Sequence, residues 1–305
     1  MCIRDSPEDQ CLFRDSRNEV YFASAQQIPQ ILREIGRLRE VTFRETGEGT
    51  GEAQDLDVYD NFYTHLFLWK PKLRAIAGAY RIGKTDEILA KHGVRGLYTY
   101  SLFHFKANLL KQIGPALEMG RSFICPQFQR EPTSLHKLWV GIGRFVAKHP
   151  QYKTLFGPVS ISNDYRDLSR QLIIDFLKHN FGSAEHSSKI KNRRKLQEFN
   201  IRGISKEYVH TVKDVADVNE LLKEIESKHH TIPVLLKHYL RLGAKTLGYN
   251  VDPNFGNVLD ALIYVDLSKT VRPLLKRYLG KDAVDDFIKR HQGEKNEAKE
   301  SSNTA

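Results

Sequence analysis

The chain has 305 residues, 40% of them hydrophobic and 28% charged, which is enough to bury a core and too apolar for a disordered protein. The 47 Lys and Arg against 37 Asp and Glu leave a net charge of +10, which favours acidic partners such as nucleic acid, anionic lipid or an acidic protein. Cys2, Cys11 and Cys125 show neither a disulfide framework nor metal-ligand spacing, and no apolar run has the length of a membrane span. We therefore expect a cytoplasmic globular protein without a metal.

Strands and helices alternate along the chain, which predicts a mixed α/β fold. Residues 70–72, Lys-Pro-Lys, separate two strands that form a hairpin. The predicted strands are 19–25, 64–69, 73–83, 96–103, 116–124 and 153–162. Helical spacing of apolar residues occurs in 26–46, in a segment from Pro132 capped by Thr133 or Ser134, and in 164–180, 232–250 and 270–291.

The composition divides the chain into five parts. Between Lys178 and Lys213 there are nine Lys or Arg against three Glu, with few large apolar residues, which is typical of an exposed insertion. The final residues are polar and predict disorder. The resulting division is a poorly defined segment at 1–18, a core at 19–177, a basic insertion at 178–231, the C-terminal part of the core at 232–290 and a disordered tail at 291–305.

Two charges interrupt the apolar strand at 116–124. Glu118 and Arg121 lie three residues apart, so a regular strand would turn them to opposite faces. A bulge near Met119-Gly120, where glycine tolerates unusual backbone angles, would bring both side chains to one cleft. From the spacing alone, a solvated face or a structural ion pair explains these charges equally well.

The charged residues follow an order that resembles a known family. Arg39 precedes Phe43 by four residues, Asp57 and Asp60 lie three apart, and Arg81 ends a strand. The order Arg-x-x-x-Phe, Asp-x-x-Asp, Arg, Glu-x-x-Arg resembles that of the acyl-homoserine lactone synthases. The fuller match is to their relatives, the ornithine N-acyltransferases, also called haemolysin-like proteins. It covers residues 20–267, in the stretches "LEMGRSFICPQFQR", "LWVGIGRF", "LFGPVSIS", "LLKHYLRLGAK" and "DPNFGNVLDALIYVDL".

This resemblance implies a GNAT-like acyltransferase fold and a reaction. The fold is a mixed central sheet, splayed at its middle strands around an acyl-pantetheine arm and flanked by helices. A (3-hydroxy)fatty acyl chain would pass to the amine of ornithine or a similar amino acid in aminolipid synthesis. Glu118 would take the proton of the attacking amine, directly or through a water, and Arg121 and Arg81 would hold carboxylate or phosphate-like charge and keep Glu118 oriented. A main-chain N–H at the bulge would receive the thioester oxygen. The implied substrate-binding residues are Arg39, Phe43, Asp57, Asp60, Arg81, Asp252 and Asn257, and a structural role for the ionic ones is equally open.

The donor implied by the resemblance is acyl carrier protein. Acetyl-CoA-using members of the fold place a Gly-rich loop before the helix that follows the split strand, where it cradles the diphosphate. Here that connection is "CPQFQREPTS" and contains no glycine, so we expect a carrier-bound thioester as substrate and no resident cofactor. The acidic carrier would dock on Arg130, Lys137 and Arg144, although a solvated helix face explains each of these equally well.

Two further surfaces follow from the C-terminal third. "TVRPLLKRYLG" sets Val271, Leu274, Leu275 and Tyr278 against basic residues, which suits peripheral contact with anionic lipid, and packing against the core explains it nearly as well. Asp252, Asn254, Asn257 and Asp260 form a polar stretch that is either a turn or part of the acceptor pocket.

Other functions receive less support. A lysophospholipid O-acyltransferase would need the pattern His-x-x-x-x-Asp, which none of the twelve histidines has, although larger relatives fuse such a module to this one and would place the present chain as their C-terminal half. The basic insertion lacks the aromatic residues of a nucleic-acid site, so we expect no nucleic acid. Cys125 before Pro126 predicts a buried structural thiol.

Overall fold

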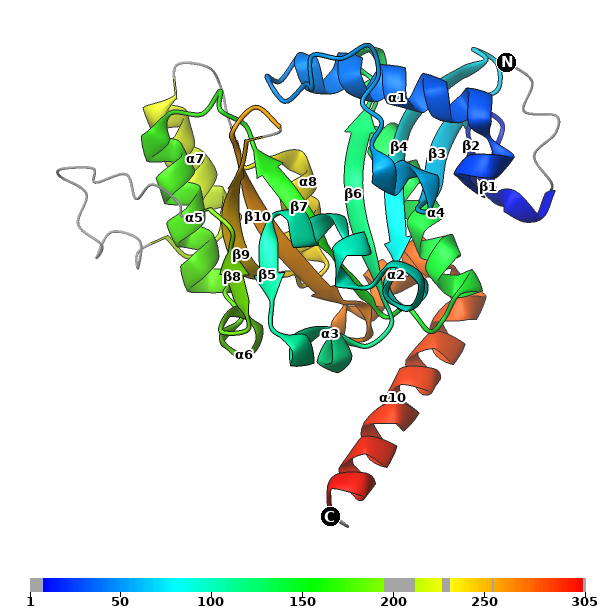
Figure 1. The fold of residues 1–305 in the computed structure, drawn as a ribbon, viewed down its shortest axis with the longest axis vertical. Helices are drawn as coiled ribbons and strands as arrows, with labels where there is room; N and C mark the ends of the chain where they lie inside the picture. The colour runs from blue at the N-terminus through cyan, green and yellow to red at the C-terminus, as the bar shows by residue number, and fades with distance from the viewer. Residues whose placement is uncertain (1–7, 195–211, 227–230, 254, 304–305) are drawn as a thin grey trace.

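The centre of the protein is an eight-stranded sheet in the order β1-β2-β3-β4-β6-β7-β10-β9 (Figure 1). The computed structural model describes residues 8–194, 212–226, 231–253 and 255–303. All neighbouring strands of this sheet are antiparallel except β6 and β7. The strands are β1 (Cys11–Arg14), β2 (Glu19–Ser24), β3 (Thr64–Lys70), β4 (Ala75–Lys84), β6 (Ala116–Ile124), β7 (Thr154–Ile161), β9 (Lys245–Asp252) and β10 (Val258–Asp266).

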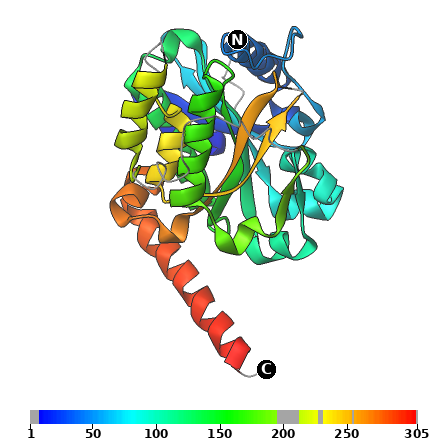
Figure 2. The ribbon, with the colours of Figure 1, turned by 90° about the vertical axis from the view of Figure 1, so that its left-hand side faces the viewer.

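Helices cover both faces of this sheet, and a small second sheet pairs β5 (Phe103–Phe105) with β8 (Ile190–Asn192). Turning the molecule by 90° shows the helices on either side of the sheet (Figure 2). The helices are α1 (Pro29–Arg44), α2 (Thr85–His92), α3 (Ala107–Ile113), α4 (Pro132–Lys148), α5 (Asp167–Phe181), α6 (Ala184–Ser187), α7 (Val215–Ile225), α8 (Val234–Arg241), α9 (Arg272–Leu279) and α10 (Lys281–Asn303).

Adjacent residues of β4 show which element lies on which face. Arg81 points to the face covered by α1, where it meets carboxylates of the loop that follows this helix. Tyr80 points to the other face, where its ring packs against Trp139 of α4 with the centroids 6.3 Å apart. Side chains alternate along a strand, so α1 and α4 lie on opposite sides of the sheet.

The sheet splits between its two parallel strands. β6 and β7 pair only from Ala116 to Glu118, opposite Thr154 to Phe156. One residue later the two strands are still in close contact, at Gly157 and Met119. The approach is so close that a Cβ added to Gly157 would lie 2.0 Å from the carbonyl oxygen of Met119. Beyond this contact no further pairing of β6 with β7 occurs within the described residues.

A bulge in β6 accompanies the split, two residues later than predicted. In the pairing of β4 with β6, Arg81 lies opposite Gly120 and Ala79 opposite Phe123. One residue of β4 therefore faces two residues of β6, Arg121 and Ser122. A bulge near Met119-Gly120 was predicted, and it lies at the next two residues. The positive φ of 47° belongs to Arg121, so the expectation that Gly120 would adopt the unusual backbone angles was wrong. Ion pairs made by the Arg121 side chain hold this residue in a conformation that glycine adopts more readily.

Several predicted element boundaries differ from the structure. Residues 96–103 form 3₁₀ turns at Val94–Gly96 and Tyr98–Ser101 instead of a strand, and β1 belongs to the sheet although 1–18 looked undefined. Glu131, and neither Thr133 nor Ser134, is the N-cap residue of α4. The tail predicted as disordered is helical to Asn303, because Glu, Lys and Ala favour helix even without an apolar face.

The predicted basic insertion at 178–231 is only partly described. Its first residues belong to α5, and Ile190 of β8 and Val218 and Leu222 of α7 are buried in the core. Residues 195–211 and 227–230 lie outside the described part of the chain.

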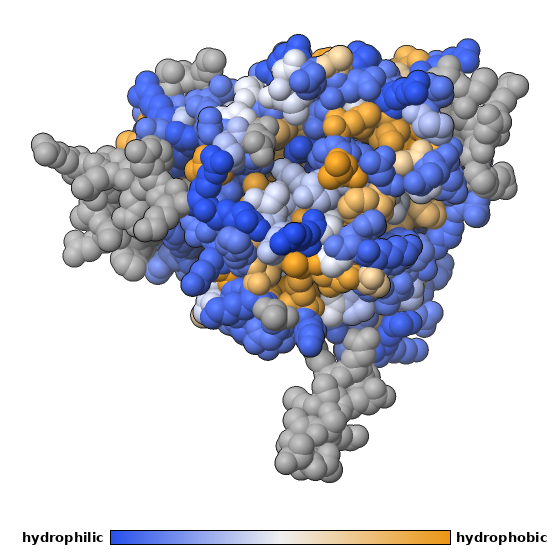
Figure 3. Space-filling view, viewed as in Figure 1, coloured by the Kyte–Doolittle hydropathy of each residue, from blue (hydrophilic) through white to orange (hydrophobic). Residues whose placement is uncertain are grey.

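The surface shows no continuous apolar plane on the face of Figure 3, where apolar patches alternate with hydrophilic ones. Among the residues that the structure describes, no helix has the length and hydropathy needed to cross a membrane. On α9, Leu275, Tyr278 and Leu279 are buried, whereas Val271 is 61% exposed. Packing against the core therefore accounts for most of the apolar face of this helix.

Candidate active site

A cavity of about 130 Å³ opens where β6 and β7 part. Met119, Gly120, Arg121 and Ser122 line it from β6, and Pro158, Val159 and Ser160 line it from β7. Phe43, at the end of α1, and Phe255 close it with an edge-to-face ring contact at 4.9 Å. Glu48, Tyr98 and Asp260 add polar groups to its wall. The cavity is thus a consequence of the split that the bulge maintains.

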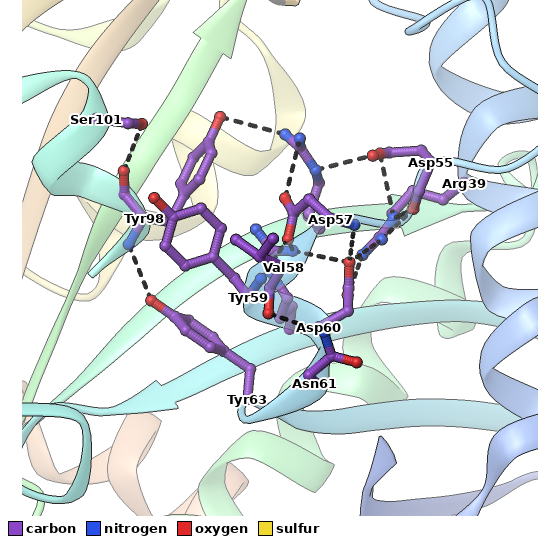
Figure 4. Close-up of polar contacts among 12 residues, drawn as sticks. Arg39, Asp55, Asp57, Val58, Tyr59, Asp60, Asn61, Tyr63, Tyr98 and Ser101 are labelled. Carbon is purple, nitrogen blue, oxygen red and sulfur yellow. Dashed lines mark hydrogen bonds and ion pairs between the residues drawn. The ribbon is translucent and has the colours of Figure 1, made fainter. Parts of the chain in front are cut away.

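Four of the predicted residues, Arg39, Asp57, Asp60 and Arg81, belong to an ionic network beside the cavity (Figure 4). Arg39 of α1 places Nη2 2.9 Å from Asp60 Oδ2 and Nε 3.2 Å from Asp55 Oδ2. Arg81 of β4 places Nη1 3.0 Å from Asp60 Oδ2 and 2.5 Å from Asp57 Oδ1. Burial works to raise the pKa of Asp60, but the two guanidinium groups outweigh it and hold this pKa below its usual range.

The local sequence explains why the carboxylates converge. Asp57 caps a 3₁₀ turn, Val58–Asn61, by accepting the Tyr59 N–H at 2.9 Å. Asp60, three residues later, accepts the Asp57 N–H at 2.8 Å, which completes a capping box. The Asp-x-x-Asp spacing therefore builds the turn and aims both carboxylates at the arginines.

Arg121 joins this network to the cavity. Its Nε lies 3.2 Å from Asp55 Oδ2 and its Nη2 3.6 Å from Asp57 Oδ2. The guanidinium also stacks over Tyr98 and Phe255, at 5.0 and 4.8 Å from the ring centroids. Three arginines and three aspartates therefore share one site, and their charges balance.

Glu118 lies on the same side of the sheet but is enclosed by donors. Its Oε1 accepts the Thr99 N–H at 2.6 Å, and its Oε2 accepts the Tyr98 N–H at 3.2 Å and the Tyr63 hydroxyl. Burial raises the pKa of this carboxyl, and it does not belong to the residues that line the cavity. Its contacts order the 3₁₀ turn at Tyr98–Ser101, and its role as a base stays a prediction.

Tyr98 links the predicted pair, because Glu118 and Arg121 contact opposite ends of it. Its main chain donates to Glu118, and its hydroxyl accepts from Arg121 Nη1 at 3.3 Å and donates to Asp252 Oδ2 at 3.0 Å. Asp252 is thus a neighbour of the site, behind Tyr98. Asn257 is exposed with a φ of 55°, which is typical of a turn residue.

The predicted docking residues differ in their surroundings. Lys137 forms an ion pair with Asp15 at 2.9 Å, and Arg144 donates to the Leu279 carbonyl at 2.9 Å. Both therefore tie α4 to neighbouring elements. Arg130 is exposed in the connection before α4, and no ion pair of it occurs among the described residues.

Four residues of the site had no predicted role in catalysis or in the ionic network: Glu48, Asp55, Tyr98 and Asp260. Asp260 belonged to the polar stretch after β9, but nothing in its spacing relates it to Glu48. Asp55 lies two residues before Asp57, and this spacing was the available signal. Tyr98 was hidden by an alternation of apolar and polar residues that imitates a strand.

Comparison with known proteins gives a consistent result. Residues 38–140 match the acetyltransferase (GNAT) domain family. The chain is 30% identical to a glycine N(alpha)-acyltransferase of Phocaeicola vulgatus over 290 residues, which are 90% of this chain and 86% of the relative. It is 24% identical to an L-ornithine N(alpha)-acyltransferase of Agrobacterium fabrum over 274 residues, 88% of this chain and 84% of that protein.

Two solved structures align with most of the chain. A CoA-dependent acyl-homoserine lactone synthase aligns with a TM-score of 0.44 and 12% identity, over 88% of this chain and 97% of its own. An N-acyl amino acid synthase from uncultured soil microbes aligns with a TM-score of 0.41 and 10% identity, over 83% of this chain and 92% of its own.

Proposed function

The chain belongs to the amino-acid N(alpha)-acyltransferases, which carry a GNAT domain, and we propose that it moves a (3-hydroxy)fatty acyl group from acyl carrier protein to an α-amino acid such as glycine or ornithine. The observation that supports this most is the cavity at the split between β6 and β7, with Arg121 in its wall. An extended thioester arm fits between strands that no longer pair. The product would be an amide-linked aminolipid precursor.

The reaction needs no covalent enzyme intermediate. The acceptor ammonium first loses a proton, and its nitrogen then forms a bond to the thioester carbonyl carbon. The tetrahedral intermediate collapses with cleavage of the carbon–sulfur bond, and the thiol leaves with the second proton of the amine. The protein supplies orientation, a proton acceptor and stabilisation of the oxyanion. The bulge leaves Arg121 and Ser122 outside the β4 ladder, and a main-chain N–H there is our proposed oxyanion donor.

We propose that the ionic network positions the cavity wall. Arg39, Asp57, Asp60 and Arg81 are occupied by one another, so they hold α1 and its loop against β4 and β6. Phe43 reaches the cavity from the end of that same helix. Of the residues discussed so far, Phe43 and Arg121 line the cavity and are proposed to contact the substrate, and Glu118 acts by fixing Tyr98.

The start of α4 supports a carrier-bound donor. The connection contains Pro126, which has no N–H to offer a diphosphate. Glu131 is the N-cap residue but makes no side-chain hydrogen bond to the helix main chain, and its carboxylate pairs with Lys70 at 2.6 Å. A negative charge therefore stands where the helix N-terminus would otherwise attract the diphosphate of CoA. Arg130 next to it offers a cation to an acidic carrier.

A peripheral membrane contact is a further part of the proposal. Val271, Lys276 and Arg277 are exposed on α9, so an apolar and two cationic side chains face outward. This group suits an anionic bilayer surface close to where a lipid product is released. Binding to vesicles with anionic lipid, and none to neutral vesicles, is the expected result of co-sedimentation.

The central test is an assay of the purified chain with defined donors and acceptors. Acyl carrier protein and CoA, each loaded with the same 3-hydroxy acyl chain, are offered with glycine and with ornithine, and mass spectrometry detects the amide. We expect amide formation, faster with the carrier-bound donor. Ester-linked phospholipid in an expressing host, with no amide, would contradict the proposal and favour O-acyl transfer.

Docking of acyl carrier protein on Arg130 is tested by a separate pair of variants. Arg130→Glu should raise the KM for acyl carrier protein while the rate with a short acyl-pantetheine thioester stays unchanged. Lys91→Glu, an equal charge change at an exposed residue of α2, should leave both unchanged. Equal loss with both donors would place Arg130 in substrate binding instead.

A further inference from the structure

Two carboxyl groups meet at the cavity from distant parts of the chain. Asp260 of β10 lies directly opposite Ser160 of β7 in the sheet, so both side chains share one face. Glu48, from the loop after α1, accepts a hydrogen bond from the Ser160 hydroxyl at 3.1 Å. Asp260 and Glu48 are 5% and 7% exposed, and both line the cavity. The register of β7 with β10 thus brings the two acids together.

Asp260 lacks a partner that would explain its burial. In the described part of the chain it forms no hydrogen bond and no ion pair. A buried carboxyl without a partner is costly, because water is removed and nothing replaces it. Such a group facing a cavity indicates that a ligand supplies the missing donors. A donor that suits two neighbouring carboxyl groups is cationic.

We propose that Asp260 and Glu48 receive the α-ammonium group of the acceptor amino acid and take up the proton it loses before it attacks the thioester. This inference rests on the proposed function of the same cavity. Arg121 lies in the opposite wall and is 11% exposed at its side chain; beside its ion pairs with Asp55 and Asp57, its guanidinium has further N–H groups that suit the acceptor carboxylate. Carboxyl groups on one side and a guanidinium on the other match a zwitterion. The substrate class is therefore a free α-amino acid, rather than an amine without a carboxylate.

The proton balance assigns one step to this pair. The ammonium gives its first proton to a carboxylate of the pair, and the free amine then forms the N–C bond. The second proton leaves with the thiol when the C–S bond breaks. The carboxyl group returns its proton to solvent after the amide has left. Glu118 is less suited to this step, because Tyr63, Tyr98 and Thr99 already donate to it.

The electrostatic surroundings suit a proton acceptor near neutral pH. Burial raises the pKa of Glu48 to about 7, although the hydrogen bond from Ser160 and the charge of Arg121 oppose this, and Asp164 adds to it. The pKa of Asp260 is also raised, by burial and then by Asp252 and Glu48, against Arg121. The ammonium group of a bound amino acid lowers the pKa values of both carboxyl groups. Substrate binding therefore favours the carboxylate form that can accept the proton.

The decisive variants are Asp260→Asn and Glu48→Gln, with Glu52→Gln as the control. Glu52 is an exposed carboxylate of the same loop and does not line the cavity. We expect the Kd and KM for glycine and for ornithine to rise roughly ten- to hundredfold in each cavity variant, because a charge-assisted hydrogen bond is lost. The KM for the acyl donor should stay within about twofold of the wild-type value, as should every constant of the control.

The pH profile separates proton transfer from simple binding. The wild-type kcat/KM should decrease as the pH is lowered below about 7, because Glu48 becomes protonated there. In Glu48→Gln this acidic limb should move or vanish, whereas a purely structural role would leave it in place. Asp260→Asn should melt no earlier than wild type, because it removes an uncompensated buried carboxyl, so its loss of affinity cannot be attributed to unfolding.

The outcomes distinguish this inference from the proposed function. A wild-type chain that acylates amino acids, with unchanged Kd and pH profile in both variants, overturns only the role of Asp260 and Glu48. Weaker binding of ornithine with unchanged binding of glycine assigns the pair to the side-chain ammonium and overturns the α-ammonium assignment. A wild-type chain that acylates no amino acid with either donor overturns the proposed function, whereas calorimetric binding of glycine still tests the pair by itself.

Discussion

Two groups of buried charges lie on either side of Arg121, and they differ in how they are compensated. In the ionic network, Arg39, Asp60 and their partners form ion pairs at 2.5–3.6 Å, and positive and negative groups are equal in number. At the cavity, Asp260 has no partner among the described residues, and Glu48 accepts from a neutral serine. Compensated charges can hold elements together, whereas uncompensated ones lower stability until a cation arrives. Under our proposals, the compensated group shapes the site and the uncompensated group receives the substrate.

The largest effect should follow from breaking the network. Arg81→Met removes a guanidinium partner from the buried Asp60 and from the half-buried Asp57, which keep only Arg39 and Arg121, and should lower the free energy of unfolding by about 3–5 kcal/mol. Urea denaturation measures this change. Arg37→Met is the matched control, since Arg37 pairs with Glu34 on the exposed face of α1 and should cost at most about 1 kcal/mol. Equal losses of stability at both positions would show that the buried network contributes no more to stability than an exposed ion pair.

The two groups should also differ in their response to pH. The pKa of Glu48 is raised in the folded protein, so stability should fall as pH rises from its ordinary value of 4.5 to about 7, by up to about 3 kcal/mol. The pKa of Asp60 is lowered, so its contribution is present above its ordinary value of 3.8 and is lost as pH falls below it. Denaturation across pH 3–8 should show both slopes, and Glu48→Gln should make the first slope shallower, because Asp260 and Glu118 also contribute to it, and leave the second unchanged.

Glu118→Gln sharpens the assignment of the proton acceptor. The amide keeps one acceptor oxygen and loses the other, which should cost about 1–3 kcal/mol of stability and displace Tyr98. Removal of a general base lowers kcat roughly 10²- to 10⁴-fold, and we expect a smaller decrease here. The acidic limb of the pH profile of kcat/KM should stay unchanged. If that limb disappears in this variant and persists in Glu48→Gln, Glu118 is the base.

The smallest effect is expected at Tyr98, whose hydroxyl contacts Arg121. Tyr98→Phe removes the hydroxyl that Arg121 contacts at 3.3 Å and that reaches Asp252 at 3.0 Å. Loss of these neutral–ionic contacts should cost about 1 kcal/mol, and the KM for the amino acid should rise only a few-fold. Tyr59→Phe is the control, because Tyr59 stacks near Arg81 at 5.6 Å and its hydroxyl does not contact Arg121.

The order and type of most elements follow from local sequence. The strand at 116–124 was predicted to the residue, because an apolar run ends at Cys125-Pro126. The hairpin of β3 and β4 and the helices α1, α4 and α5 also follow from periodicity and turn residues. The splayed mixed sheet was expected from the family resemblance and is confirmed.

The errors occur where distant residues decide the local conformation. Tyr98 and Thr99 turn away from a strand because their N–H groups donate to Glu118, about twenty residues along the chain. The bulge lies at Arg121 because Asp55 holds its side chain. Glu48 and Asp260 meet through the register of β7 with β10, which no local spacing contains. Long-range pairing, and not propensity, sets these details.

The contact between Gly157 and Met119 sets a geometric limit on the enzyme. Even a methyl group at residue 157 would press on the neighbouring main chain, so the two halves of the sheet can approach this closely only at a residue without a side chain. The strands diverge from that point onward, which makes it the apex of a wedge. The backbone fixes the start of this wedge, and under the proposed function the side chains farther out would select the length of the acyl chain.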